Sequence, residues 1–474
     1  MSTTKIVATI GPATNTKSKL RALHRSGMRI ARLNGSHNNF EWHSKTIELI
    51  RQALPELPII FDIPGRKVRT TDLKHEPSFL VGDLITLTTD KKNDGKKKIP
   101  VNYANLHKDA KVGTTILADD GTLKFTVIKI NGRDIICQAQ TSGQLKSRKG
   151  INLPLLNLNT KLITERDRKM VGFAIDSGVD FIGISFVESA KHVRAIQKLT
   201  KNNCPRIVAK IENLPGLKHM REIITAADAV MIDRGDLSVE TNLESLAISQ
   251  KKILKVALEN KKPVIVATEM LHTMIENSFP TKAEVSDISN AILDGAAATM
   301  LSGETAIGKH AIESVNVMKK VSDATINHMH QLLDEQKPVI GDSIPQVMGQ
   351  ASALICRSLP ITKIIAVTIS GFAARAIALS RPRQPILAIS NDVMAARSFN
   401  ILPGTVGVYV NMPFSKVSTD HIPACLNILW ERKLISRNDM LLVTAVAYPR
   451  SGNRMNLIQT HVVNDLAEIM GWSQ

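Results

Sequence analysis

The stretch IVAKIENLPGLKHMREIITAADAVMIDRGDL, residues 207–237, decides the fold class. It opens on a short run rich in β-branched residues, continues through a longer amphipathic stretch, and returns to an apolar run at Ala229. Short apolar runs of this kind are typical of strands buried on both faces, and the longer stretch between them fits a helix. The sequence therefore predicts a strand–helix–strand unit of the kind that builds a parallel sheet.

The same alternation recurs on both sides of this unit. The predicted strands begin near Lys5, Arg29, Pro58, Asp180, Ile207, Ala229, Val264 and Ala297. Eight such units predict an α/β fold, a closed (β/α)8 TIM barrel, whose chemistry is expected at the carboxyl ends of the strands.

Two regions interrupt or follow this pattern. Between about 71 and 153, short strand-like segments such as Leu84–Thr88 and Lys124–Ile130 predict an inserted β domain. After about 338 the alternation restarts with Lys363–Thr368, Pro385–Ser390 and Met440–Val446, which predicts a separate α/β domain. We expect a barrel over 1–70 and 154–337, an insertion over 71–153, and a C-terminal domain over 338–474, divided from the barrel at Lys337-Pro338. Three domains fit 474 residues at roughly 150 residues each.

The composition is that of an ordinary globular protein, with 43% hydrophobic and 22% charged residues. The four cysteines are widely spaced and form no CxxC pair, which argues against structural zinc and disulfides and favours a reducing cytoplasm. The first residues lack the apolar core of a secretory signal, and no run approaches the ~18 apolar residues of a membrane span. We expect a cytoplasmic protein without membrane contact.

The chain is strongly basic, with 61 Lys and Arg against 43 Asp and Glu and a net charge of +18. Such a field attracts anions, including nucleotides, sugar phosphates and nucleic acid. Aromatic residues make up only 4%, which argues against a dedicated nucleic-acid binder that stacks bases. Charge alone does not choose among the other anions, which include an acidic membrane face.

Polar side chains follow the predicted strands and should converge on one rim of the barrel. They are Arg32, Asn34, Ser36, His37, Asp62, Lys67, Arg69, Lys210, Glu212, Asp233, Arg234, Asp236, Thr268, Glu269, Ser302 and Glu304. Each alone could cap a helix or form a surface ion pair. Together they supply carboxylate oxygens for magnesium and fixed cations for a phosphate, which phosphoryl transfer requires. Glu212 and Asp236 suit the metal, whereas Arg32, Arg69 and Lys210 suit the phosphate.

Several long motifs resemble those of the pyruvate kinase family, in the family's order. They are TKIVATIGPAT from Thr4, SGMRIARLNGSH ending at His37, KGINLP from Lys149, SGVDFIGISF ending at Phe186, AKIEN from Ala209, RGDL from Arg234, PTKAEVSD from Pro280 and MLSGETAIG ending at Gly308. The resemblance implies a phosphotransferase of glycolysis that moves the phosphoryl group of phosphoenolpyruvate to ADP. It also implies that the insertion is a small β-barrel lid, that the C-terminal domain is regulatory and allosteric, and that the chain forms a homotetramer.

The resemblance assigns roles to individual residues. Lys210, Thr268 and Arg32 would be catalytic, with Lys210 at the moving phosphoryl group and Thr268 organising proton delivery. The implied substrate-binding residues are Arg32, Lys210, Gly235, Asp236, Thr268 and Ser302. The implied nucleotide-binding residues are Asn34, His37, Arg69 and Lys149. Glu212 and Asp236 would bind magnesium or manganese, and the lid, with Asp119 and Asp120, would close to exclude water.

The segment DIPGRKVR, residues 62–69, departs from the family's usual DTKGPEIR. The resemblance places a monovalent cation on Asn34, Ser36, Asp62 and Ile63. Lys67 replaces a glutamate here, and its ammonium could supply the charge of that ion. We therefore expect activity without potassium.

Three further departures lie near the expected site. Asp233 stands in place of an alanine, Glu269 in place of a glutamine and Glu188 in place of an arginine. We expect Asp233 to repel phosphoenolpyruvate unless Arg234 neutralises it.

The segment from Thr368 to Ile386 resembles the family's effector-phosphate loop. The resemblance implies a sugar-phosphate effector held by Thr368, Ser370, Gly371 and Arg381. A second hydroxyl of the usual loop is missing, because Ala373 occupies its place. An ordinary helix amino terminus with surface arginines is the alternative.

Two other classes of function stay open. A barrel lyase acting on phosphoenolpyruvate or pyruvate would need no ADP and no KGINLP motif. A regulatory or nucleic-acid-binding relative should have lost Lys210 or Asp236, and both are present.

Overall fold

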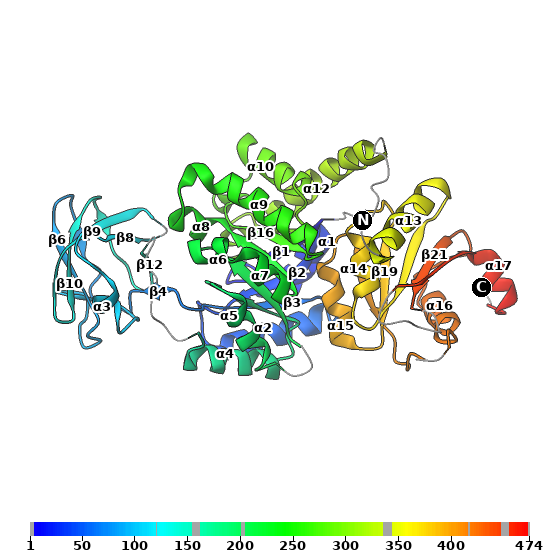
Figure 1. Ribbon diagram of the computed structural model, residues 1–474, viewed down its shortest axis with the longest axis horizontal. Coiled ribbons are helices and arrows are strands. Elements are labelled where there is room, and N and C mark those ends of the chain that lie inside the picture. The colour runs from blue at the N-terminus through cyan, green and yellow to red at the C-terminus, as the bar shows by residue number, and fades with distance from the viewer. Residues whose placement is uncertain are drawn as a thin grey trace.

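The structure is a computed structural model that describes residues 4–119, 121–153, 162–200, 204–334, 344–415, 418–446 and 455–472. The chain is elongated, with an all-β part at the left of Figure 1, a barrel in the middle and an α/β part at the right. Within the described ranges, every helix is too short or too polar to cross a lipid bilayer.

The middle part is a closed barrel of parallel strands, in the order β1-β17-β16-β15-β14-β13-β3-β2. The strands are β1 (Lys5–Thr9), β2 (Met28–Asn34), β3 (Ile59–Ile63), β13 (Phe181–Ile184), β14 (Arg206–Ile211), β15 (Ala229–Asp233), β16 (Val264–Ala267) and β17 (Ala298–Leu301). Each begins at, or next to, a residue predicted from the sequence. The predicted (β/α)8 barrel is confirmed.

Helices surround the barrel. They are α1 (Lys17–Ser26), α2 (Phe40–Ala53), α4 (Glu165–Asp176), α5 (Ala190–Gln197), α6 (Leu214–Lys218), α7 (Met220–Ala226), α8 (Arg234–Glu240), α9 (Leu246–Glu259), α10 (Lys282–Leu293), α11 (Gly303–Ala306) and α12 (Ala311–Asp334), with 3-10 turns η1 (Leu243–Ser245) and η2 (His272–Ile275). Several begin at a residue whose side chain accepts a bond from the first turn. Thr164 starts α4 and Thr281 starts α10, each in a capping box with an acidic residue three positions later.

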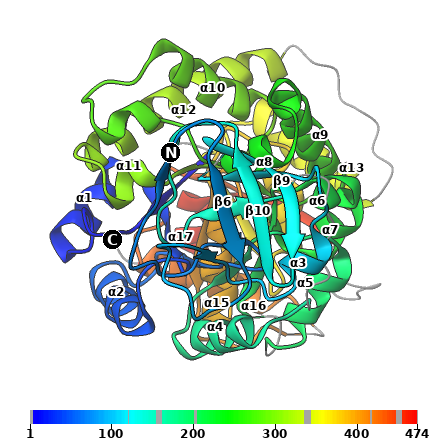
Figure 2. The ribbon, with the colours of Figure 1, turned by 90° about the vertical axis from the view of Figure 1, so that its left-hand side faces the viewer.

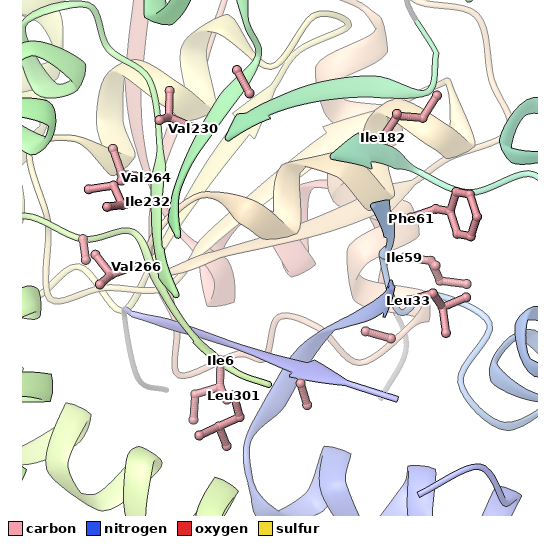
Figure 3. Packing of buried hydrophobic residues seen from close by; sticks show 14 of the residues in the cluster. Ile6, Leu33, Ile59, Phe61, Ile182, Val230, Ile232, Val264, Val266 and Leu301 are labelled. Atoms are coloured by element: carbon pink, nitrogen blue, oxygen red, sulfur yellow. The ribbon is translucent and has the colours of Figure 1, made fainter. Parts of the chain in front are cut away.

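The barrel strands are buried on both faces, as alternating side chains show. Ile6 packs in the apolar cluster between strands and helices, whereas its neighbour Val7 belongs to the cluster inside the barrel. Figure 3 shows the outer cluster, in which Ile6 and Leu301 from adjacent strands lie together. Because a strand's side chains alternate between its faces, one apolar run fills both clusters.

The insertion after β3 forms a seven-stranded sheet, in the order β4-β12-β8-β9-β10-β6-β7, beside a two-stranded sheet of β5 and β11. Its elements are β4 (Val68–Arg69), β5 (Ser78–Phe79), β6 (Leu84–Thr88), β7 (Ile99–Pro100), α3 (Leu106–Asp109), β8 (Thr115–Ala118), β9 (Leu123–Asn131), β10 (Asp134–Ala139), β11 (Gly143–Gln144) and β12 (Gly150–Asn152). A bridge between Thr70 and Val101 joins the two ends of the larger sheet. This closed sheet has its own apolar core and lies in front of the barrel in Figure 2.

The C-terminal part is a five-stranded sheet, in the order β20-β19-β18-β21-β22, with β22 antiparallel. Its elements are α13 (Ile344–Ser358), β18 (Lys363–Val367), α14 (Phe372–Ala378), β19 (Ile386–Ser390), α15 (Val393–Ser398), η3 (Phe399–Ile401), β20 (Thr405–Tyr409), α16 (His421–Glu431), β21 (Met440–Ala445), β22 (Leu457–Val462) and α17 (Val463–Ile469). The predicted α/β character is confirmed. The predicted boundary, Lys337-Pro338, lies outside the described residues.

The C-terminal part packs against the barrel through apolar and polar contacts. Val7 and Met231 inside the barrel belong to the same apolar cluster as Phe399 after α15. The buried Asp180 carboxylate, just before β13, accepts bonds of 2.7 Å from Arg51 of α2 and from Arg397 of α15. The two parts are therefore joined by a shared core and by buried charges.

Candidate active site

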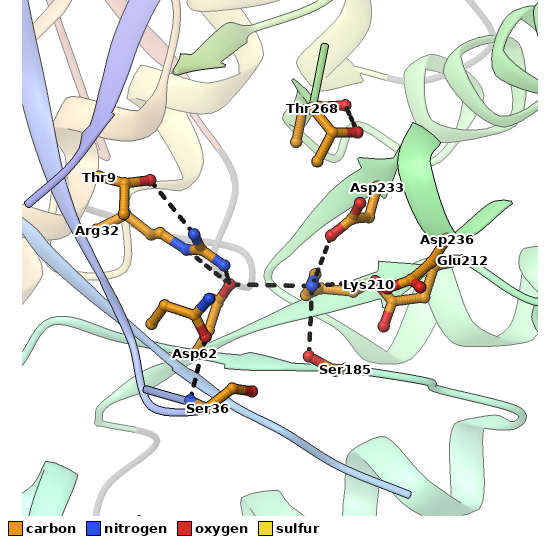
Figure 4. Close-up of polar contacts among 12 residues, drawn as sticks. Thr9, Arg32, Ser36, Asp62, Ser185, Lys210, Glu212, Asp233, Asp236 and Thr268 are labelled. Carbon is orange, nitrogen blue, oxygen red and sulfur yellow. Dashed lines mark hydrogen bonds and ion pairs between the residues drawn. The ribbon is translucent and has the colours of Figure 1, made fainter. Parts of the chain in front are cut away.

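The polar side chains at the carboxyl ends of the strands converge on one region of the barrel (Figure 4). They come from successive strands or from the turns that follow: Thr9 in β1, Arg32 in β2, Asp62 in β3, Ser185 after β13, Lys210 in β14, Glu212 after β14, Asp233 in β15, Asp236 in α8 and Thr268 after β16. Because barrel strands run parallel, residues distant in sequence meet at one rim.

Lys210 is the cation at the centre of this group. Its buried Nζ lies 2.8 Å from Asp233 Oδ2 and 3.0 Å from Glu212 Oε2. Asp62 Oδ2 is 4.0 Å away, and Nζ donates a hydrogen bond of 3.3 Å to Ser185 Oγ. Burial opposes the charged ammonium, but the surrounding carboxylates outweigh it and raise the pKa of Lys210 above its usual value. Lys210 is therefore a permanent positive charge at the rim.

Glu212, Asp233 and Asp236 form an acidic cluster beside Lys210, with one oxygen of each within 4.8 Å of the others. Burial raises the pKa of Glu212 and of Asp236; at Asp233 burial is outweighed by Lys210, and the pKa falls. Glu212 Oε2 is fully buried and accepts no hydrogen bond from the part of the chain that is described. Hard, close oxygen donors of this kind fit Mg²⁺ or Mn²⁺.

Lys67 brings a second ammonium to the acidic cluster. Its Nζ forms an ion pair with Asp236 Oδ1 and lies 5.5 Å from the centre of the Phe186 ring. The preceding Arg66 pairs with Glu188 and neutralises that carboxylate. Lys67 therefore lies at a carboxylate predicted to bind the divalent metal.

Of the four residues predicted for a monovalent cation, Asp62 is paired with a different cation, the Arg32 guanidinium. Arg32 Nε and Nη2 donate to Asp62 Oδ2 at 3.0 and 2.8 Å, and Nη1 donates to Thr9 Oγ1 at 3.3 Å. The predicted ligands lie in β2, in β3 or in the turn after β2: Asn34, Ser36, Asp62 and Ile63. Ser36 N donates to Asn34 Oδ1 at 3.1 Å, which fixes that turn.

Thr268 occupies a strained turn directly after β16, with φ of +69°. That region is sparsely populated by β-branched residues and costs on the order of 1–3 kcal/mol. Thr268 Oγ1 donates to Ala267 O at 2.6 Å and accepts from Gly235 N at 2.8 Å, and Arg234 donates to the Thr268 carbonyl at 2.7 and 3.2 Å. These contacts hold the hydroxyl predicted for proton delivery at a defined position.

Asp233 is neutralised by a different residue from the one that the sequence predicts. Lys210 pairs with it, whereas Arg234 pairs with Asp287 of α10 at 2.5 Å. The reason is local geometry: Asp233 ends β15 and its side chain turns toward Lys210 in Figure 4, while Arg234 begins α8. Expecting Arg234 as the neutralising partner was therefore wrong.

A cavity of about 340 Å³ adjoins Arg32. Asn34, His37 and Ser302 also line it. Burial lowers the pKa of His37, and Arg69, Arg32, Arg148 and Lys149 lower it further. The imidazole is therefore neutral and lies in a positive field suited to phosphates.

Two of the residues predicted to bind the nucleotide, Arg69 and Lys149, belong to the insertion. They lie at its first and last strands, β4 and β12, which pair with each other. Arg69 is in β4, and its Nη1 donates to Arg148 O at 3.1 Å. Lys149 Nζ lies 2.6 Å from Asp119 Oδ1. Asp120 lies outside the described residues.

The predicted effector residues are only partly brought together. Gly371 N donates to Thr368 Oγ1 at 3.1 Å, and Ser370 lies between them in the turn before α14. Arg381 is instead half-buried against the barrel, where it donates to Ile292 O at 3.4 Å and Ala296 O at 3.1 Å. Burial lowers the pKa of Arg381 to about 10.

Three hydrogen-bonding groups of the site are not among those predicted from the sequence. Thr9 and Ser185 follow the same strand-end rule as the predicted residues, and applying that rule to the first and fourth strands would have found them. The main-chain N of Phe186, which donates to Glu212 Oε1 at 2.8 Å, has no side-chain signal in the sequence.

Comparisons with known proteins agree with this geometry. Residues 1–315 match the family described as "Pyruvate kinase, barrel domain", and residues 347–461 match "Pyruvate kinase, alpha/beta domain". The chain is 36% identical to a pyruvate kinase of Bacillus licheniformis, over 98% of this chain and 81% of that protein. It is 36% identical to a pyruvate kinase of Thermococcus litoralis over 93% and 94% of the two chains, and 33% identical to one of Corynebacterium glutamicum over 98% of both.

Proposed function

The chain belongs to the pyruvate kinase family of phosphotransferases, and from that premise we propose that it transfers the phosphoryl group of phosphoenolpyruvate to ADP, giving pyruvate and ATP. The observation that carries the proposal is the buried Lys210 ammonium beside the acidic cluster. A fixed positive charge at that point stabilises negative charge on a phosphoryl group as it moves.

The residues around Lys210 take complementary parts in this proposal. Arg32, held by Asp62 and Thr9, offers a guanidinium to a phosphate oxygen. Thr268, held by Gly235, keeps its hydroxyl where a proton can be passed toward the enol carbon. Gly235, Asp236 and Ser302 complete the proposed substrate contacts.

Glu212 and Asp236 would hold the divalent cation, magnesium or manganese. When bound, such an ion supplies Lewis acidity and a positive charge for anionic oxygens of the substrate. The protein's contribution is to keep Glu212 buried and Asp236 half-buried, with Phe186 N fixing one oxygen of Glu212.

We assign nucleotide binding to the 340 Å³ cavity and to the lid that faces it. His37 and Asn34 line the cavity, and Arg69 and Lys149 add positive charge from the insertion. Closure of the lid over this region would exclude water, which otherwise competes with ADP for the phosphoryl group.

The direct test is pyruvate formation from phosphoenolpyruvate and ADP with magnesium. We expect turnover, and a loss of about 10³-fold in kcat for Lys210→Met, because one preorganised charge at a transition state contributes about that much. Lys255→Met, which removes an exposed lysine of α9, is the matched control. Absence of turnover in the unaltered protein, with either metal, would leave a regulatory relative as the better description.

We also propose that the enzyme does not require potassium. The support is the positive charge that Lys67 adds to the acidic cluster, where the family usually has a glutamate. Rates in sodium and potassium at equal ionic strength should agree within about twofold, because equal ionic strength gives equal screening of charges. Strong activation by potassium would overturn this part alone.

We further propose a homotetramer with a sugar-phosphate effector at residues 368–371. The effector contact would come from Thr368, Ser370 and Gly371, with Arg381 committed to the barrel. Light scattering tests the assembly. Calorimetry with fructose bisphosphate, ribose phosphate and glucose phosphate tests the effector, and three silent titrations would refute it.

A further inference from the structure

Asp233 is a carboxylate that the proposed reaction does not use. It ends β15, at the position from which an aspartate often caps the following helix, yet its side chain makes no capping bond to α8 within the described residues. Instead it turns to the rim, buried, where its Oδ2 lies 2.8 Å from Lys210 Nζ. The side chain is therefore directed at the acidic cluster rather than at the helix.

The geometry of the cluster suits one shared cation. In an octahedral magnesium site, oxygens 2.1 Å from the ion stand at most about 4.2 Å apart, and a small rearrangement brings the cluster's 4.8 Å within that reach. Glu212 is fully buried, and its Oε2 has Lys210 Nζ as an ion-pair partner at 3.0 Å. The side chain therefore presents its oxygens to the cluster and not to solvent.

Two ammonium groups lie against the three carboxylates of the cluster. Lys67 pairs with Asp236, and Lys210 pairs with Asp233 and Glu212. The two ammonium groups offset two of the three carboxylate charges, so one negative charge remains at the cluster, and a divalent ion would compete with Lys67 for Asp236.

We propose that Asp233 is a third carboxylate ligand of the divalent-cation site, and that it strengthens the binding of Mg²⁺ or Mn²⁺ before phosphoenolpyruvate binds. The inference rests on the proposed function, because it deepens the metal site of that reaction. Lys67 acts in the opposite sense, as a cation that the metal must displace from Asp236.

The test is Mn²⁺ binding to the full chain without substrate or ADP, measured by electron paramagnetic resonance of free Mn²⁺ and by calorimetry. We expect Asp233→Asn to weaken binding by about tenfold or more, since even partners of metal ligands contribute that much. Lys67→Gln should tighten it. Glu188→Gln, which alters a carboxylate held by Arg66 outside the cluster, is the matched control and should leave the affinity unchanged.

A second pair of variants distinguishes direct binding of the ion by Asp233 from an indirect effect, in which Asp233 changes Mn²⁺ affinity only by neutralising Lys210. If Asp233 binds the ion, Asp233→Asn weakens Mn²⁺ binding in the Lys210→Met background as well. If Asp233 only neutralises Lys210, the effect disappears in that background and the proposal is overturned. Equal affinity of Asp233→Asn and the unaltered protein, both folded by circular dichroism, overturns it too.

Pyruvate formation by the unaltered protein is measured in parallel. Normal turnover without any Asp233 dependence of Mn²⁺ affinity counts against this inference alone. Asp233-dependent Mn²⁺ binding without turnover counts against the proposed function alone.

Discussion

His192 of α5 is buried, and its lowered pKa should make the free energy of unfolding depend on pH in the acid range. Burial lowers its pKa to about 4, with Arg66 adding to the shift and Asp167 opposing it. Its Nδ1 has no hydrogen-bond partner among the described residues. The folded protein therefore keeps this ring neutral at a pH where the unfolded chain, with a pKa near 6.5, binds a proton.

As pH falls from about 6.5 to 4, the unfolded state gains a proton at His192 that the folded state does not, so stability decreases over this window. The loss should approach about 3 kcal/mol at pH 4 and vanish above pH 7. Urea unfolding of His192→Leu should show a smaller decrease than the unaltered protein. The exposed His219 provides the control, and an unchanged slope in His192→Leu would contradict the prediction.

For single residues, the position at the rim could be predicted from the sequence, but the partner of a charged side chain could not. The location of Lys210 and Glu212 at the rim follows from their place at the end of a predicted strand, which the chain's periodicity indicates. The partner of Asp233 does not, because Lys210 and Arg234 are both available and only the direction of the side chain at the end of β15 decides between them. Arg381 is a similar case, since burial against the barrel depends on how two folded parts meet.

Helix α10 connects a helix cap to the proposed proton-delivery residue. Its capping residue Thr281 bonds to Glu284, which also accepts from Thr273 of η2 at 2.5 and 2.8 Å. One turn later Asp287 holds Arg234, and Arg234 holds the carbonyl of Thr268. The start of α10 thus positions the strained turn after β16.

Asp287→Asn should lower kcat by about tenfold with a smaller change in KM, because Arg234 loses the charge that orients it on Thr268. Steady-state kinetics with phosphoenolpyruvate and ADP measure this split. Asp294→Asn, just after the other end of α10, removes a carboxylate paired with Lys251 and should leave kcat unchanged. A matching loss in both variants would indicate general destabilisation instead.

Helices and strands are the features that the sequence predicts best. The barrel strands are predicted at their observed starts because each is a short apolar run closed by polar residues. The strands of the insertion are predicted less completely, since β4, β5, β7 and β11 have two residues each and carry no periodicity. The bridge that closes the inserted sheet pairs Thr70 with Val101, a contact between distant residues that local pattern does not encode.

Across the whole molecule, Asp180 joins the barrel to the C-terminal part. Its fully buried carboxylate is shared by Arg51 and Arg397. Removing one partner of a buried ion pair typically costs about 3–5 kcal/mol. Arg397→Met should therefore lower the midpoint of thermal unfolding, measured by calorimetry, whereas Arg432→Met, an exposed arginine of the same part, should change it little. Equal midpoints would show that Arg51 alone suffices.

The net charge of +18 should affect encounter with anionic substrates. Opposite charges accelerate association, and salt screens them beyond about 10 Å at 0.1 M. We expect kcat/KM for phosphoenolpyruvate to fall as a chloride salt is raised from about 0.02 to 0.3 M, with kcat nearly constant. A kcat/KM that is independent of salt would show that the charge does not act on the substrate.

The inserted sheet encloses an apolar core of its own, whereas the barrel interior and the C-terminal sheet share one. In evolutionary terms the insertion is closer to an exchangeable module, because another closed sheet would bring its own core and would need to keep polar contacts such as the bond from Asn152 Nδ2 to Glu240 Oε1. The C-terminal part is not exchangeable in this way. A graft there would have to reproduce the surface that meets the barrel, so substitutions on the two sides of that contact are expected to arise in compensating pairs.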